Sequence, residues 1–346
     1  MHKRGLIKSV STTINDIAKV ANVSPSTVSR VIANNSRISK ETSENVRKIM
    51  KEMNYYPNMI ARSLAIRTTK IFAVMVPGDA EKTFLHPFFP EVLRGITAAS
   101  YRNDYKVLIS GVSDVTEEKK VIREFTRGGI AEGIILMTSR VADPSIEELT
   151  KLNFPFVVVG KPERDKEINW VDNNNYAIGY ELAKHLVDQG HKRIAFLGVC
   201  PEFYVTVDRM HGYKQALKDS SLPVIEDLII KNKFREDNGY DLMQRLFDIG
   251  KKPTAVIACD DLLAFGVLKS IAEHSLSVPQ DIAVAGFNNV PLSEYCIPPL
   301  TSVEVNPYGL GVKAVELLMA DINSEHKSFD RAIIPAKLVI RKSTVR

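Results

Sequence analysis

From Ile71 onward, short runs of consecutive apolar residues alternate with longer amphipathic stretches. Most of these runs lack polar alternation, which is typical of strands that are covered on both faces of a sheet. We expect such strands at Ile71–Val76, Lys106–Val112, Gly133–Met137, Phe156–Gly160, Arg193–Gly198, Leu228–Lys231, Thr254–Cys259 and Ile282–Phe287, with a last strand at Ala332–Arg341.

The stretches between these runs have the length and periodicity of amphipathic helices. Examples are Pro90–Asn103, Thr116–Arg127, Asn175–Gln189, Val207–Ser221, Asn238–Gly250 and Asp261–Ser275. Such alternation predicts right-handed βαβ units, and the strands suffice for an α/β body of two parallel-sheet lobes. Ligands of these folds bind at the carboxyl ends of the strands, so a cleft between the lobes is the expected small-molecule site.

The N-terminal part has a different pattern, in which residues 13–30 read TINDIAKVANVSPSTVSR. Thr13 is the expected N-cap of a first helix, and Asp16 completes a capping box. Asn22 lies in the turn, where it tolerates a left-handed backbone. Ser24 caps a second helix whose first position is Pro25. A third helix follows Ser39, and together these features predict an all-α helix-turn-helix head that places its second helix in a DNA major groove.

Charge supports this interpretation. Residues 1–70 carry 13 lysines and arginines against 4 acidic residues, whereas the remaining 276 residues carry 33 against 37. The overall charge of +5 therefore combines a basic head with a mildly acidic body. Clustered positive charge on a small helical domain is typical of phosphate binding. A solvated basic face would explain the charge but not the motif.

A short segment, Met59–Ala65, joins the two parts. It has helical propensity but too few residues to form a stable helix alone. We expect it either to fold when a partner orders it or to act as a plain tether. The length of 346 residues is consistent with two or three folding units.

Several functional classes are disfavoured by what the sequence lacks. Its apolar runs are far shorter than the ~18 residues of a membrane span, and its basic N-terminus has no apolar signal-peptide core. The cysteines, at 200, 259 and 296, form no close pair. Phosphate-binding loops, nucleophile elbows and zinc-protease motifs are missing. We therefore expect a cytoplasmic protein that is not an enzyme and has no membrane partner, metal or cofactor.

Six blocks of sequence, in order, are similar to those of one known family. They are Thr13–Val31, Asn54–Asn58, Leu186–Ala195, Asp208–Tyr213, Val278–Phe287 and Ile297–Val303. With a leucine at position 64, they resemble the lactose/galactose-repressor family of bacterial transcription regulators, and the resemblance covers nearly the whole chain.

The resemblance implies three domains. They are a helix-turn-helix DNA-binding domain at 12–56, a hinge helix or linker at 57–66, and an effector-binding and dimerisation domain at 67–346. The last is expected to resemble periplasmic sugar-binding proteins, with one lobe of about 70–170 and 306–331 and another of about 171–305 and 332–346. The implied partners are a second copy of the chain, pseudo-palindromic operator DNA and a sugar effector.

The family also implies which residues contact DNA. Pro25 and Ser26 match base-reading positions but are short, so Arg30 is expected to carry most direct readout by pairing with guanine. Leu64 matches a leucine that wedges into a base step and kinks the duplex. The full expected set is Thr13, Pro25, Ser26, Thr27, Ser29, Arg30, Asn34, Tyr55, Asn58, Ala61 and Leu64.

For the effector, Arg209 matches a sugar-clamping arginine whose fork suits two vicinal hydroxyls. Trp170 and Phe234 match aromatic lining positions, and the segment 86–89 lies where the family places the opposite wall. The full expected set is Phe88, Phe89, Trp170, Arg209, Phe234, Asp260 and Asn288.

Two residue pairs depart from the family pattern. The family usually has Asn-Asp after the strand at 254–259 and Asp-Asp after Gly286-Phe287, whereas this chain has Asp260-Asp261 and Asn288-Asn289. The acid and the amide have exchanged places. A site for hydroxyl groups keeps one carboxylate and one amide, but lactose or galactose specificity does not transfer.

The segments 168–174 and 286–289 are similar to those of maltose-type repressors of Gram-positive bacteria. This implies that maltose or a short malto-oligosaccharide releases a repressor of malto-oligosaccharide uptake and breakdown genes. The alternatives are a regulator of another sugar and a global carbon-catabolite regulator with a phosphorylated carrier protein as corepressor. A secreted sugar-binding protein or a sugar-modifying enzyme would share only the body.

Overall fold

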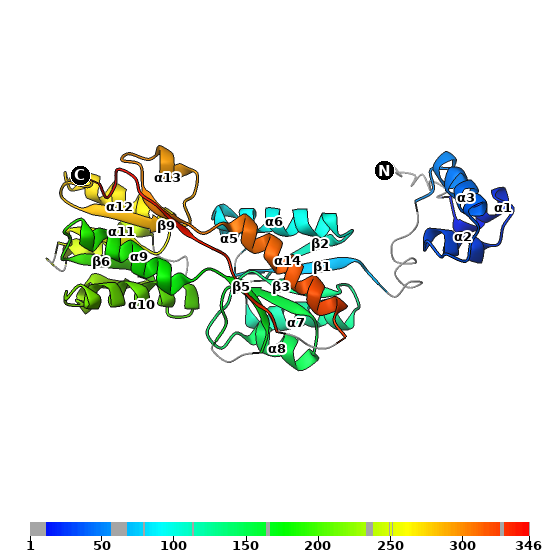
Figure 1. Cartoon of the computed structure of the whole chain (residues 1–346), viewed down its shortest axis with the longest axis horizontal. Helices are drawn as coiled ribbons and strands as arrows, with labels where there is room; N and C mark the ends of the chain where they lie inside the picture. Colours follow the sequence, from blue (N-terminus) through cyan, green and yellow to red (C-terminus); the bar gives the residue numbers. More distant parts are fainter. Residues whose placement is uncertain are drawn as a thin grey trace, which may run out of the picture. The chain divides into compact units, whose positions relative to one another are not determined.

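The computed structural model describes residues 12–56, 68–78, 80–112, 114–163, 167–232, 238–248, 250, 252–325 and 329–345. The chain divides into two units, Met1–Lys70 and Ile71–Arg346, which are coloured along the sequence in Figure 1. None of the helices in these ranges combines the length and apolarity that crossing a bilayer requires.

The described part of the first unit, residues 12–56, is a three-helix head, as predicted. Its helices are α1 (Ile14–Val20), α2 (Pro25–Ile32) and α3 (Lys40–Glu52). They share a core of Ile17, Ala18, Ala21, Val28, Val31, Val46 and Ile49. The expected hinge at 57–66 lies outside the described residues.

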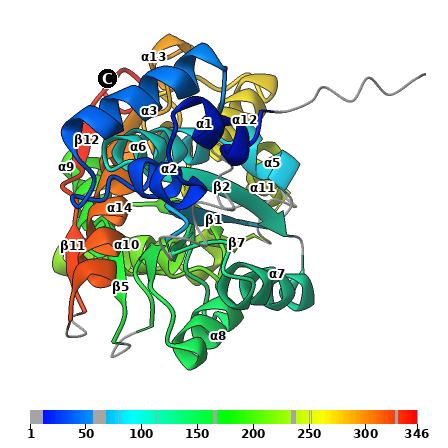
Figure 2. The same cartoon turned by 90° about the vertical axis from the view of Figure 1, so that its right-hand side faces the viewer.

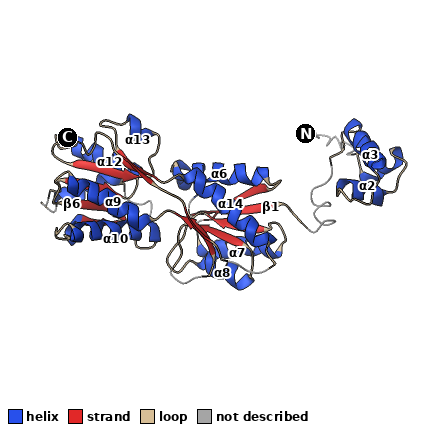
Figure 3. Ribbon diagram, in the orientation of Figure 1, coloured by secondary structure: helices blue, strands red, loops and turns tan. Residues whose placement is uncertain are grey.

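The second unit alternates strands and helices (Figure 3). The elements of its first half are β1 (Ile71–Pro77), α5 (Ala80–Leu85), α6 (Phe88–Arg102), β2 (Lys106–Val112), α7 (Val115–Arg127), β3 (Gly133–Leu136), α8 (Pro144–Leu152), β4 (Phe156–Val159) and β5 (Asn169–Asp172). Those that follow are α9 (Asn175–Asp188), β6 (Ile194–Val199), α10 (Tyr204–Asp219), a 3-10 turn (Glu226–Leu228), β7 (Ile229–Lys231), α11 (Gly239–Asp248), β8 (Ala255–Ala258), α12 (Asp261–Glu273), β9 (Ala283–Phe287), α13 (Leu292–Tyr295), β10 (Thr301–Glu304), α14 (Pro307–Asn323), β11 (Arg331–Ile333) and β12 (Lys337–Val339).

These strands form two six-stranded sheets, which confirms the predicted two-lobe α/β body. The strand orders are β11-β5-β4-β3-β1-β2 and β12-β10-β9-β8-β6-β7. Neighbouring strands pair in parallel, except that β12 runs antiparallel to β10. Each sheet with its helices is one lobe.

The first lobe has a separate core on each face of its sheet. Phe72 and Val74 of β1 pack with side chains of α6 and α14, whereas Ala73 and Met75 face side chains of α7 and α8. Figure 2 shows these helix pairs on opposite sides of the sheet. In the second lobe, α9 packs on α10 and α11 packs on α12, around one large core.

Among the described residues, the chain passes between the lobes three times, after β5, after β10 and after β11 (Figure 1). Asn173 lies in the first of these crossings. Its Nδ2 donates to the carbonyl oxygens of Val305, at 3.0 Å, and Ile334, at 2.9 Å. One amide side chain therefore ties together all three crossings.

The structure corrects the expected boundaries of the lobes. The single strand expected at 332–341 is two strands in different sheets, β11 and β12, because the chain crosses between lobes at Ile334–Ala336. The expected lobe limits after residues 170 and 331 fall inside β5 and β11. The strands β5 and β10, together with α8 and α14, were not among the elements named from the sequence.

Candidate functional site

The first candidate surface is the outer face of α2 in the head. At the start of α1, the Asp16 N–H donates to Thr13 Oγ1 at 3.4 Å, and the Thr13 N–H donates to the Asp16 carboxylate at 2.9 Å. Asn22 adopts the expected left-handed backbone with a φ of 53°. Ser24 Oγ accepts from the Thr27 N–H at 3.1 Å, so α2 starts where it was predicted to start.

The side chains of α2 separate by face. Its buried side chains are Val28 and Val31, its exposed ones are Pro25, Ser26 and Arg30, and Thr27 and Ser29 are partly exposed. The hydroxyl groups of Ser26 and Thr27 lie 2.7 and 2.9 Å from Ser24 Oγ, so the cap engages them. Arg30 is left as the long side chain on the outer face.

Two further predicted DNA-binding residues lie at other places in the head. Asn34 is exposed, and its Oδ1 accepts from Nη2 of Arg47 at 2.7 Å. Arg47, a cation of α3 that the family blocks did not point to, therefore lies beside it. Tyr55 packs against the core, and burial raises the pKa of its phenol. The remaining predicted contacts, at Asn58, Ala61 and Leu64, lie outside the described residues.

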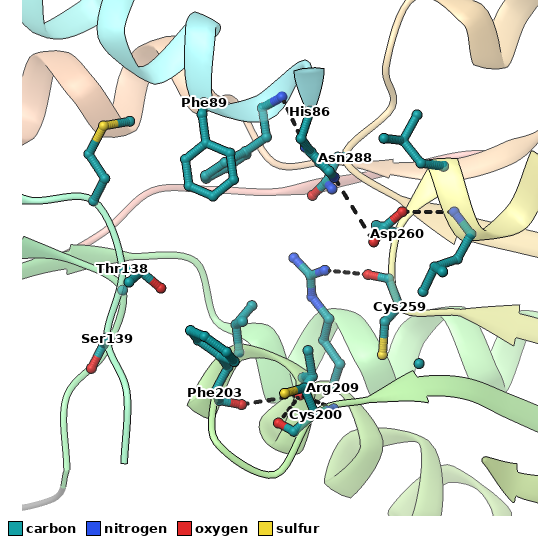
Figure 4. Close-up of a pocket in the computed structure, with 18 of the residues that line it drawn as sticks. His86, Phe89, Thr138, Ser139, Cys200, Phe203, Arg209, Cys259, Asp260 and Asn288 are labelled. Atoms are coloured by element: carbon teal, nitrogen blue, oxygen red, sulfur yellow. Dashed lines mark hydrogen bonds and ion pairs between the residues drawn. The ribbon is translucent and has the colours of Figure 1, made fainter. Parts of the chain in front are cut away.

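The second candidate site is a cavity of about 410 Å³ between the two lobes (Figure 4). It lies at the carboxyl ends of strands of both sheets, where Gly160 follows β4, Asp260 follows β8 and Asn288 follows β9. Its aromatic lining is Phe88, Phe89 and Phe203. Its polar lining includes His86, Thr138, Ser139, Lys161, Asp172, Asn173, Arg209, Asn232, Asn238, Asp260 and Asn288.

Arg209, in α10, directs its guanidinium into this cavity (Figure 4). Its Nε donates to Asn175 Oδ1 at 3.0 Å, and its Nη1 donates to the Cys259 carbonyl oxygen at 2.7 Å. Its Cζ lies 4.3 Å from the centre of the Phe287 ring. A Cβ at Gly179 would lie 2.3 Å from the Arg209 carbonyl oxygen, so only glycine allows α9 to lie this close to α10.

The carboxylate of Asp172 supports Arg209 through Asn175. It accepts from the Lys161 N–H at 2.8 Å, the Asn173 N–H at 2.7 Å and Asn175 Nδ2 at 3.0 Å. Burial raises the pKa of Asp172, and these hydrogen bonds and the charge of Arg209 oppose that rise. Burial likewise lowers the pKa of Arg209, against the nearby carboxylates. The buried cation Arg209 and the buried anion Asp172 are therefore joined through Asn175 in one hydrogen-bonded chain.

Asp260 is the N-cap of α12. Its Oδ1 accepts from the Leu263 N–H at 2.9 Å, and its Oδ2 lies 4.0 Å from Nε2 of His86, which belongs to the other lobe. Asn288 has a φ of 94°, and its N–H donates to the Val303 carbonyl oxygen at 2.8 Å. The exchanged acid and amide thus both line the cavity in the second lobe.

Two further contacts bridge the lobes beside the cavity. The Val141 N–H donates to the Glu202 carbonyl oxygen at 2.9 Å. Lys161 Nζ lies 3.4 Å from Asp208 Oδ2. Arg140, next to Val141, forms ion pairs within its own lobe with Glu118, at 2.5 Å, and Asp143, at 3.3 Å. These ion pairs hold the loop that reaches the second lobe.

The structure brings together five of the seven predicted effector residues at this cavity: Phe88, Phe89, Arg209, Asp260 and Asn288. The prediction for Trp170 is wrong. Side chains alternate between the two faces of the sheet along β5. That of Trp170 packs in the core between the first sheet and helices α7 and α8. Phe234 lies outside the described residues.

Other lining residues were missed, among them Lys161, Asp172 and Phe203. For Lys161 and Asp172 a signal was available, because each comes directly at or after the carboxyl end of a strand in the first sheet. Phe203 lies four residues beyond the end of β6, just before α10, where the end of the strand no longer singles out one residue. Together, the apolar walls and internally paired charges suit an uncharged ligand with hydroxyl groups and an apolar face.

Comparison with known sequences gives two family matches. Residues 13–58 match a model described as bacterial regulatory proteins, lacI family, and residues 183–344 match a periplasmic binding protein-like domain. The HTH-type transcriptional regulator MalR of Streptococcus pneumoniae is 38% identical over 316 residues, which cover 90% of this chain and 93% of that protein.

Comparison with solved structures identifies proteins with the same arrangement of elements. The complex of the transcriptional regulator CelR with cellobiose has a TM-score of 0.76 at 27% identity, covering 96% of this chain and 99% of that one. The lac repressor dimer bound to operator and the anti-inducer ONPF has a TM-score of 0.86 at 24% identity, covering 97% and 100%. The second likeness shows a shared fold.

Proposed function

The chain belongs to the lacI family of bacterial regulatory proteins, and from that premise we propose that it is a sugar-released repressor of carbohydrate-utilisation genes. The observation that carries the sugar assignment is the interlobe cavity, with aromatic walls and a convergent guanidinium, carboxylate and amide. The 38% identity to MalR supports maltose or a short malto-oligosaccharide as the effector and malto-oligosaccharide genes as the target.

In this proposal, three polar residues recognise sugar hydroxyls. Arg209 donates from its guanidinium, Asp260 accepts at the oxygen that its helix cap leaves available, and Asn288 supplies an amide. The apolar face of a pyranose ring packs on Phe88 and Phe203. His86 lies across the cleft from Asp260, so a hydroxyl between them would contact both lobes.

The DNA-binding side of the proposal rests on α2. Two heads of a homodimer would read the two halves of a pseudo-palindromic operator. Arg30 is the direct reader, while the short Pro25 and Ser26 allow a close approach. The remaining contacts to the DNA backbone and minor groove are assigned to Thr13, Thr27, Ser29, Asn34, Tyr55, Asn58, Ala61 and Leu64.

An electrophoretic mobility shift on DNA from upstream of the protein's own gene tests the proposal. The full-length chain should retard this DNA, and maltose or maltotriose should abolish the shift, while cellobiose at the same concentration should not. Release by cellobiose alone would overturn the effector assignment. Failure to retard the DNA under every condition, with operons for malto-oligosaccharide breakdown as further probes, would overturn the regulatory assignment.

A further inference from the structure

The buried carboxylate of Asp261 lies next to the cavity but does not line it. The side chain is fully inaccessible to solvent at the first position of α12. Its Oδ2 accepts from the Val290 N–H at 2.9 Å and from Ser293 Oγ at 2.7 Å. Its Oδ1 accepts from Ser302 Oγ at 2.6 Å. One carboxylate thus connects α12, the segment after β9, α13 and β10.

The segment that it holds carries a cavity residue in an unfavourable backbone conformation. Asn288 and the following Asn289 have φ values of 94° and 44°. Such left-handed conformations persist in non-glycine residues when the surroundings impose them. The Asn289 N–H donates to Ser302 Oγ at 3.0 Å, and Ser302 Oγ in turn donates to Asp261. The turn is therefore fixed from both sides, through Ser302 and through Val290.

The backbone of β9 is adapted to this carboxylate. A Cβ at Gly286 would lie 2.3 Å from Asp261 Oδ1, so a side chain there would displace the acid. The carboxylate packs against the end of β9 at the point where the chain turns toward Asn288. Asp261 directly follows Asp260, the N-cap of α12. The bonds of Asp261 therefore also fix the end of the helix from which Asp260 reaches the cavity.

We propose that Asp261 is a positioning residue for the effector site, which holds the left-handed turn at Asn288 and Asn289 in the conformation that binds the effector. This inference rests on the proposed sugar-binding function, and it assigns a second role to the exchanged pairs. In each pair the first residue lines the cavity, while the second residue, Asp261 or Asn289, belongs to the network beneath it.

The charge state of Asp261 makes the proposed role depend on pH. Burial raises the pKa of this carboxyl to about 7, and the neighbouring Asp260 adds to the rise. The other titratable groups that face it are Arg209 of α10 and Cys296, which follows α13. A protonated Asp261 loses one acceptor site, so the turn is held less firmly as the pH falls through 7.

The experiment compares full-length wild-type protein with Asp261→Asn, which keeps the shape but not the carboxylate, and with Ser302→Ala, which removes the link to Asn289. Ser343→Ala is the matched control. Ser343 is a buried serine whose Oγ accepts from the Thr301 N–H, at the start of β10, and donates to the Val284 carbonyl oxygen, near the start of β9. Hydrogen exchange of segment 288–290 is measured without ligand, and binding of maltose and maltotriose is measured by calorimetry from pH 6 to pH 8.

We expect Asp261→Asn and Ser302→Ala to speed exchange in segment 288–290 and to weaken binding about tenfold at pH 8, because a hydrogen bond to a charged group is lost. The ratio of the Asp261→Asn and wild-type dissociation constants should shrink toward pH 6. The contribution of His86 is common to both proteins and cancels in this ratio. Ser343→Ala should lower the melting temperature without either change.

Unchanged exchange in segment 288–290, or sugar binding at pH 8 as tight as that of wild-type protein, would overturn the positioning role. If wild-type protein binds neither sugar, the proposed effector fails instead, and hydrogen exchange alone still decides whether Asp261 holds the turn. If Asp261→Asn does not fold, the exchange and binding measurements on Ser302→Ala test the positioning role instead.

Discussion

The ion pair between Lys161 and Asp208 joins the two lobes beside the cavity, so breaking it should weaken effector binding without touching the core. Lys161 follows β4 in the first lobe, and Asp208 lies in α10 of the second. If the effector binds the arrangement in which the lobes are bridged, each contact that holds this arrangement raises the fraction of binding-competent protein.

The structure sets the size of this effect. The Nζ–Oδ2 distance is 3.4 Å, and the two side chains are 37% and 25% exposed. Ion pairs of this kind contribute about 0.2–1 kcal/mol, which corresponds to a roughly 1.4- to 5-fold change in dissociation constant. The effect should shrink in high salt, because mobile ions screen partly exposed charges.

A double-mutant cycle measured by calorimetry isolates this contribution. Lys161→Met and Asp208→Asn should each weaken maltose binding, and the double variant should be no weaker than either. The charge-swapped pair, Lys161→Glu with Asp208→Lys, should recover part of the loss. Lys313→Met is the control, because Lys313 pairs with Glu316 within α14 and its side chain is 39% exposed, close to that of Lys161. Additive losses, or an equal loss in the control, would refute the bridging role.

Three further outcomes are expected. Arg30→Ala should abolish operator retardation while circular dichroism and the melting temperature stay unchanged, and normal affinity would remove Arg30 as the reader. Arg209→Met should abolish release by maltose. It should also lower the free energy of unfolding by about 2–6 kcal/mol, because buried acceptors on Asn175 and Cys259 lose their donor. Urea unfolding measures this loss, and a smaller loss would contradict the prediction. Burial raises the pKa of Asp261 to about 7, so the free energy of unfolding is highest below the unfolded pKa near 4 and falls as the pH rises to 7, although the ionised carboxylate is the form that holds the turn more firmly. Wild type should therefore lose on the order of 2 kcal/mol relative to Asp261→Asn between pH 5 and pH 7, and parallel stability curves would contradict this.

The head was predictable nearly residue by residue because its signals are local. A capping hydroxyl such as that of Ser24 acts on an amide three residues away, and Asn22 needs only its own backbone conformation. The apolar strands were recognisable for the same reason. The strand β10 was missed because its buried residues include Thr301 and Ser302, whose hydroxyls are satisfied by distant partners such as Asp261.

The candidate site was harder to predict because it depends on contacts between distant segments. Arg209 and Asp260 were found through family motifs, but their support by Asn175 and His86 comes from other elements. Trp170 was misplaced because an isolated aromatic residue does not reveal whether it packs in the core on a face of its sheet or lines the cavity at the end of the strand. The end of the chain was read as one strand although Pro335, which has no backbone N–H to donate within a sheet, marks the crossing between the lobes.

The order of the strands also has a consequence for biosynthesis. The helices α1, α2 and α3 of the head are complete once residue 52 has been synthesised. The first lobe, in contrast, needs α14 for its core and β11, which ends at Ile333, for the edge of its sheet. At about 5–20 residues per second, a ribosome takes tens of seconds to travel between these points. During translation, each nascent chain therefore has the three head helices well before it has the segments that complete the sheets of the two lobes.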